Sequence, residues 1–190
     1  MHTIEPFWKW RDFYTAETDG KSPFFGREYS EFEFTEKIYN YYIHPQWDYF
    51  GSDNLYMKLL YADYEQQSCV IELLGEWNDC IRNDIMFLKR DVVDVLTGNG
   101  INKFVLIGEN VLNFFGSDNA YYEEWYEDIK DSDGWIVAVN FREHVIEDMM
   151  QEKIHHFINI HERYTDLNWR KFRPHHLVSY VDNLLLKRIA

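Results

Sequence analysis

Polar residues follow each of three apolar segments of this sequence, in positions where α/β proteins often bind ligands. If the segments are parallel strands, their carboxyl ends meet at one edge of the sheet. The candidate binding residues at that edge are Glu76, Asn78, Asp79, Glu109, Asn110, Asn140 and Arg142. The carboxylates of Glu76, Asp79 and Glu109 could hold a hard cation, because such ions prefer oxygen ligands. The alternative is that these side chains cap helices and form ion pairs at the ends of loops.

Other kinds of chemistry find little support. Cys80 would lie in the first turn of a helix, which favours a thiolate, but Glu76 and Asp79 oppose it, so we expect an unreactive cysteine. On one helix, His144 and His155 would lie about 16 Å apart and could not share a metal ion. The HExxH, glycine-rich nucleotide-binding and GxSxG motifs are absent. We therefore predict no metal centre, no cofactor and no enzymatic activity, with a small-ligand or divalent-metal binding protein or enzyme as the alternative.

Charge restricts the kinds of partner. The 190 residues include 19 Lys and Arg against 33 Asp and Glu, which gives a formal net charge of −14. Nucleic acids and anionic membranes repel such a surface, so we expect a protein partner or self-association. Residues 161–190 are an exception, because they hold six basic and three acidic side chains. This basic tail either docks on the acidic body or binds an acidic partner.

Two cysteines, Cys69 and Cys80, are fewer than a secreted domain of this size usually carries. The first residues do not form a basic segment followed by an apolar one. No stretch approaches the roughly 18 uninterrupted apolar residues of a membrane span. These features predict a cytoplasmic protein with reduced thiols.

The elements that must position the candidate residues can be predicted from residue 55 onward. Apolar runs at 55–62 and 69–74, separated by a polar turn, predict an antiparallel hairpin. The next segment predicts an amphipathic helix that ends at Gly98 and Gly100. Its apolar stripe, at helical spacing, is Ile81, Ile85, Leu88, Val92 and Leu96.

The alternation of strands and helices continues after this helix. We predict a strand at 104–107, a helix at 119–129, a strand at 135–141 and a long helix from about 143 to 162. Each strand–helix–strand unit should be a right-handed crossover between parallel strands. The stripe of the long helix would be Ile146, Met150, Ile154 and Phe157.

The two ends of the chain differ from this α/β core, which spans residues 55–161. Pro174 begins a helix over 175–189, preceded by a polar stretch at 163–173 that resembles a hinge. The apolar face of this helix would comprise Leu177, Val181, Leu184, Leu185 and Ile189. Residues 1–54 are turn-rich and aromatic; 19 of the 35 Phe, Trp and Tyr residues lie in residues 1–64. We expect residues 1–54 to wrap the core and bury their rings, or else to use them as an interface.

The sequence therefore predicts an α/β fold in one domain, 1–190. It would contain a mixed sheet with an antiparallel hairpin and βαβ crossovers. The order of elements resembles the STAS, or anti-sigma-factor-antagonist, fold. In that family a phosphorylatable serine follows an apolar strand in the motif Asp-Ser-Ser-Gly, and the matching stretch here is Phe115-Gly116-Ser117-Asp118. The resemblance implies a protein-interaction or regulatory module and a possible phosphorylation site at Ser117. The whole chain also resembles uncharacterised proteins of Bacteroidetes-type bacteria.

Overall fold

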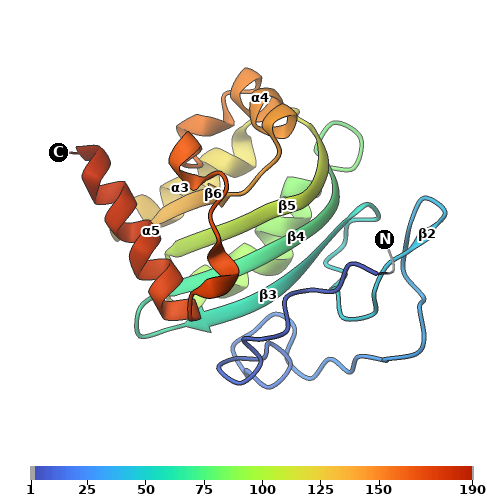
Figure 1. Cartoon of the computed structure of the whole chain (residues 1–190). Coiled ribbons are helices and arrows are strands. Elements are labelled where there is room, and N and C mark those ends of the chain that lie inside the picture. Colours follow the sequence, from blue (N-terminus) through green and yellow to red (C-terminus); the bar gives the residue numbers. More distant parts are fainter. Residues whose placement is uncertain (1–2, 190) are drawn as a thin grey trace.

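A four-stranded mixed sheet forms the centre of the computed structural model, which describes the backbone of residues 3–189 and the side chains of residues 3–186 (Figure 1). The strand order is β3-β4-β5-β6. The first two strands pair antiparallel and the other neighbours pair parallel. The strands are β3 (Leu55–Asp63), β4 (Ser68–Asn78), β5 (Lys103–Phe115) and β6 (Trp135–Val139). The predicted α/β class with a mixed sheet is confirmed.

Helices connect the parallel strands. A helix with a central π-helical turn joins β4 to β5; its parts are α1 (Asp84–Phe87), η1 (Leu88–Val93) and α2 (Asp94–Gly98). α3 (Ala120–Lys130) joins β5 to β6, and α4 (Glu143–Gln151) follows β6. The first helix begins later than its stripe predicted. Ile81 precedes it and is 81% exposed, whereas Ile85 and Leu88 are buried.

All of these helices pack on one face of the sheet. Because the strand order runs in one direction from β4 to β6, right-handed crossovers place both connecting helices on the same side. Their buried side chains, including Leu88, Trp125 and Val145, join Ile71 and Phe104 of the sheet in one apolar cluster. The other face of the sheet has to be covered by the two ends of the chain.

The prediction of one long helix over 143–162 was wrong. α4 ends at Gln151, and Lys153 adopts a left-handed conformation with φ 61°. Two short 3-10 helices follow, η2 (Ile154–His156) and η3 (Glu162–Tyr164). Between them Asn159 pairs with the outer edge of β6, because its N–H donates to the carbonyl of Ile136 at 2.8 Å. The chain leaves the helix in order to cover this edge strand, which would otherwise expose unpaired backbone groups.

The apolar face of α4 also differs from the predicted stripe. Val145 and Met149 are fully buried, whereas Met150 is 43% exposed and Ile146 is half-buried. Ile154 is buried, but it lies in η2 beyond the end of the helix. The buried face is therefore displaced by one residue from the face that the sequence predicted.

The C-terminal segment covers part of the second face. Tyr164 and Trp169 are fully buried, the latter in the 3-10 helix η4 (Trp169–Lys171). These two rings anchor the stretch that resembles a hinge. α5 (Pro174–Ile189) packs on the same face through Leu177, Val178 and Val181. The side chain of Ile189, expected on this apolar face, lies outside the described side chains.

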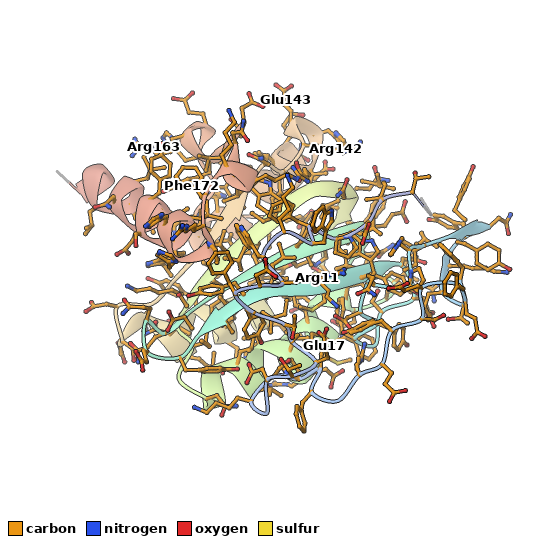
Figure 2. All side chains as sticks on the ribbon, turned by 60° about the horizontal axis from the view of Figure 1, so that its bottom comes forward. Arg11, Glu17, Arg142, Glu143, Arg163 and Phe172 are labelled. Atoms are coloured by element: carbon orange, nitrogen blue, oxygen red, sulfur yellow. The ribbon has the colours of Figure 1, made fainter. Side chains whose placement is uncertain are left out.

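The N-terminal segment covers the remainder of this face and one edge of the sheet. Residues 3–27, which we call the arm, run across it in irregular turns (Figures 1 and 2). The arm buries Trp10 in the apolar cluster of this face and Phe24 in the cluster of the helix-covered face. Residues 28–42, which we call the hairpin segment, contain the short strands β1 (Lys37–Ile38) and β2 (Tyr41–Tyr42) (Figure 1). Ile38 is buried against Tyr56 and Leu74 of the sheet, whereas most of the aromatic rings of this segment face solvent. Among the described residues, no helix is long and apolar enough to cross a membrane.

Candidate functional site

The predicted strand-end residues lie in two separate places. Val139, at the end of β6, is opposite Ile107 of β5, whereas Asn78, at the end of β4, is opposite Phe115. The distance from Ile107 to Phe115 along an extended strand is roughly 25 Å. The strand ends are therefore staggered and do not meet at one edge.

Glu76 and Asp79, at the end of β4, are occupied by protein partners. Glu76 accepts hydrogen bonds from the Asn113 amide at 3.0 Å and from the Tyr39 hydroxyl. Asp79 accepts from the Tyr122 hydroxyl at 2.6 Å, from the Trp77 indole and from the N–H of Ile85. Burial raises the pKa of Asp79 to about 6 despite these donors. Asp79 thus ties β4 to α1 and α3.

The structure does not bring Glu76, Asp79 and Glu109 together around one position that a cation could occupy. Glu76 is opposite Asn113 on β5, about 13 Å along that strand from Glu109. Asp79 contacts side chains of the helix-covered face, whereas Glu109 contacts Trp169 and Arg170 on the other face. The alternative interpretation, in which the strand-end side chains cap helices and form ion pairs, describes Asp79 and Glu109 better than a cation site does.

Three other candidates were expected to bind a ligand or to be modified. Asn78 accepts a hydrogen bond from the N–H of Ile81, so it shapes the turn before α1. Asn110 is half-buried in β5 opposite Leu74. Ser117 is exposed in the loop before α3, so it is accessible, and its phosphorylation stays a prediction.

Glu109, Asn140 and Arg142 come together in an open groove of about 760 Å³ at the carboxyl end of β6. Arg142 and Glu143 line this groove, and Figure 2 shows them next to each other where α4 begins. The guanidinium of Arg142 donates to the carbonyl of Glu109 at 3.3 Å, and Asn140 exchanges two hydrogen bonds with the backbone of Leu167. We call this the acidic groove, because its lining includes the carboxylates of Glu109, Glu143, Glu147, Glu162 and Asp166.

Sequence reasoning missed two buried charges on the arm-covered face. Lys58 of β3 and Glu72 of β4 are directly opposite in the sheet and are 7% and 1% exposed. The ammonium of Lys58 lies 3.4 Å from a carboxylate oxygen of Asp48 and 3.7 Å from the centre of the Tyr29 ring. Burial lowers the pKa of Lys58, and Asp48 opposes this shift. A lone charged residue inside an apolar strand run was the signal that could have identified both positions.

Glu72 is the point where the arm, the sheet and the C-terminal segment meet. One of its oxygens accepts from the backbone N–H of Phe7 at 2.9 Å, and the other lies 3.8 Å from the guanidinium of Arg170. Arg170 also pairs with Glu109 and stacks on the Trp169 ring at 4.4 Å. Burial raises the pKa of Glu72 to about 7; Phe7 and Arg170 lower it. These contacts fasten the arm to the sheet.

A third acidic cluster lies on the helix-covered side. Carboxylate oxygens of Asp94, Glu124 and Asp128 lie within 4.8 Å of one another, a spacing that a metal ion could bridge. The fully buried Lys89 inserts its ammonium among them, 2.9 Å from Asp128, and Arg90 pairs with Glu124 at 2.6 Å. The cations of the chain itself therefore neutralise this cluster.

The outer surface of residues 3–54 is unusually aromatic. Phe32 is 88% exposed, which is the largest value among the exposed large apolar side chains of the described residues. The remainder of the described chain has six exposed large apolar side chains, of which only two are aromatic, Phe115 and Tyr180. The exposed rings of the N-terminal segment are Trp8, Phe13, Phe25, Phe32, Tyr39, Tyr41, Tyr42 and Tyr49.

Comparison with known proteins adds no family to this description. No protein-family model matches the chain, and no curated protein has a matching sequence. The function is therefore inferred from the geometry of the chain itself.

Proposed function

We propose that this chain is a non-enzymatic interaction module that binds a basic protein segment through its hairpin segment, residues 28–42. The observation that carries the proposal is the concentration of exposed rings there: Phe32, Tyr39, Tyr41 and Tyr42 are 88%, 65%, 63% and 45% exposed. Isolated exposed apolar residues are ordinary, but a concentration of exposed rings marks an interaction surface. Tyrosine and phenylalanine are also enriched at protein interfaces.

The charges around these rings indicate the chemistry of the partner. Glu28, Glu31 and Glu33 are exposed in the same segment, so the rings are interleaved with carboxylates. Lysine and arginine suit both features, because they pair with carboxylates and stack on ring faces. Lys37 already does this within the hairpin segment, with its ammonium 4.4 Å from the centre of the Tyr42 ring.

Long-range electrostatics supports the same partner. The formal net charge of −14 attracts a basic segment from solution and speeds its encounter with the protein. This attraction alone would not select the hairpin segment over other acidic surfaces. The rings have to supply the selectivity, which makes their contribution testable apart from the charge.

A peptide titration tests the proposal. The probe is a fluorescent peptide of alternating arginine and glycine, titrated at physiological salt with the full chain and with a Phe32→Ser, Tyr41→Ser variant of unchanged charge. We expect the variant to lose at least about tenfold in affinity, because each ring–cation contact is worth about 0.5–2 kcal/mol. Ile81→Ser, which removes an exposed apolar side chain elsewhere, is the matched control. Equal affinity of all three proteins would show binding by net charge alone and would reject the proposal.

A further inference from the structure

We propose that a groove at the amino end of β6 is a binding site for a small molecule that combines a planar aromatic body with one carboxylate. The groove lies between the end of α3, the start of β6, η2 and the second half of α5, and its volume is about 840 Å³. Small-molecule sites are usually clefts of about 300–1,000 Å³. We call it the aromatic groove.

The apolar part of the lining suits a flat ligand. The rings of Tyr126 and Phe157 lie 6.3 Å apart, centre to centre, and the Trp135 ring lines the same groove. Leu185 and Leu186 of α5 form the facing wall, and Leu186 is 60% exposed. A planar aromatic body can stack on the rings and remove this leucine from water.

The polar part of the lining favours a carboxylate. Lys103 and Lys130 both line the groove. Asp182, an acid in the same lining, is already occupied: it accepts from the Trp135 indole at 2.8 Å and lies 3.7 Å from the Lys103 ammonium. Lys130 pairs with Glu127, but both side chains are more than a third exposed, and such surface pairs are weak. The Lys130 ammonium can therefore pair with a ligand carboxylate.

Two histidines add hydrogen-bonding groups. The rings of His155 and His156 are 4.5 Å apart. Burial, and to a lesser extent His156, lowers the pKa of His155. Its Nδ1 is shielded from solvent and forms no hydrogen bond with the described residues. A ligand in the open groove can reach the exposed ring of His156, but not this enclosed nitrogen.

The acidic groove at the other end of β6 provides an internal contrast. Its described lining contains five carboxylates and one guanidinium, that of Arg142, and only Glu109 among the five also pairs with Arg170. This excess of carboxylates repels an anion. The described lining of the aromatic groove instead has two lysines, Lys103 and Lys130, against two carboxylates, those of Asp133 and Asp182. An anionic aromatic molecule should therefore bind at the amino end of β6 and not at the carboxyl end.

Calorimetric titration with indole-3-carboxylate as the probe tests this inference. We expect one site per chain on the full-length protein, and the cationic analogue tryptamine should not compete for it. Lys103→Gln combined with Lys130→Gln should weaken binding by about tenfold or more, because a charged hydrogen-bond partner is lost. Leu186→Ser, an exposed substitution, should weaken it independently, and Arg142→Gln should leave it unchanged. No binding at about 1 mM probe, or equal affinity for the wild-type protein and the double lysine variant, would overturn the inference.

Discussion

The two faces of the central sheet are covered in different ways. Helices cover one face, and the side chains buried beneath them, such as Ile71, Phe104 and Trp125, form a continuous apolar cluster. The arm and the C-terminal segment cover the other face, where Lys58 and Glu72 are buried among apolar neighbours. The first cover consists of helices, whereas the second combines the helix α5 with irregular segments. Among the described residues, buried charges in the middle of the sheet occur only beneath the second cover.

Backbone hydrogen bonding explains the difference. A helix satisfies its own N–H and C=O groups, so it can lie on a purely apolar surface. An irregular segment has to find partners elsewhere for each buried backbone group. The N–H of Phe7 finds one in Glu72, and the carbonyl of Phe172 finds one in the indole of Trp10. Side chains of the sheet and of the arm thus replace the hydrogen bonds that a helix would have made internally.

The largest expected effect is on the arm-covered face. Trp169→Ala removes a ring that contacts Phe7 and Trp10 and that Arg170 stacks on. We expect the free energy of unfolding to fall by about 3–5 kcal/mol, as for other buried tryptophans. Because this ring fastens the arm, limited proteolysis should cleave residues 3–27 before the core. If protease cleaved the arm and the core of the variant at the same rate, the result would contradict our view that the two faces of the sheet are covered in different ways.

On the helix-covered face we expect a similar loss in the free energy of unfolding, but no single segment should become accessible to protease before the others. Leu88→Ala should lower the free energy of unfolding by about 2–5 kcal/mol, because Leu88 is fully buried. Ile81→Ala, from the same predicted stripe, should cost less than about 0.5 kcal/mol because Ile81 is exposed. Denaturant unfolding measures both values. A small loss for Leu88→Ala, or a large one for Ile81→Ala, would show that the first helix packs differently.

Glu72 should make stability depend on pH. Burial raises its pKa from the ordinary 4.5 to about 7, so the folded state binds the proton more tightly than the unfolded state. The stabilisation is complete below pH 4.5 and is lost as the pH rises through 7. The size of the effect is about 3 kcal/mol.

The variant Glu72→Gln isolates this effect from other titrating groups, among them Asp79, whose pKa is raised to about 6. The free energy of unfolding of Glu72→Gln, taken relative to that of the wild-type protein, should be higher at pH 8 than at pH 5. Glu33→Gln, at an exposed position, is the control and should show no such change. A constant difference for Glu72→Gln would show that this carboxyl does not titrate as the structure implies.

The smallest effect on stability is expected in the hairpin segment. Phe32→Ser should change the free energy of unfolding by less than about 0.5 kcal/mol, because the ring is 88% exposed. Thermal unfolding monitored by circular dichroism measures this. A loss above about 1 kcal/mol would place Phe32 in the structural cover and remove it from the proposed binding surface.

Sequence patterns predicted the regular part of this molecule well. The order of hairpin, helix, strand, helix and strand follows from apolar runs and helical spacing, which local geometry imposes directly. The prediction failed where tertiary demands override local periodicity. The segment after Gln151 has a helical apolar pattern, but the edge of β6 needs backbone partners and draws Asn159 out of the helix.

The candidate site was harder to predict for a related reason. Sequence alone places polar residues at strand ends but gives neither the relative lengths nor the register of the strands. Glu76 of β4 is opposite Asn113 of β5, four residues beyond Glu109, so the two carboxylates are separated although both follow apolar runs. The partners of Glu72 come from the arm and from Arg170, and the partner of Lys58 is Asp48. No periodic pattern predicts such contacts.

The central claim is that the N-terminal segment covers the sheet with its inner side and binds a partner with its outer side. Site-specific photo-crosslinking in native cells tests this claim most directly. The photoreactive residue p-benzoylphenylalanine would replace Phe32 in one variant, Tyr41 in a second and Ile81 in a third, all exposed positions. We predict the same discrete crosslinked product from the two hairpin positions, none from position 81, and a partner whose crosslinked segment is rich in lysine and arginine. Crosslinks that are equally strong at all three positions, or absent from both hairpin positions, would contradict the account.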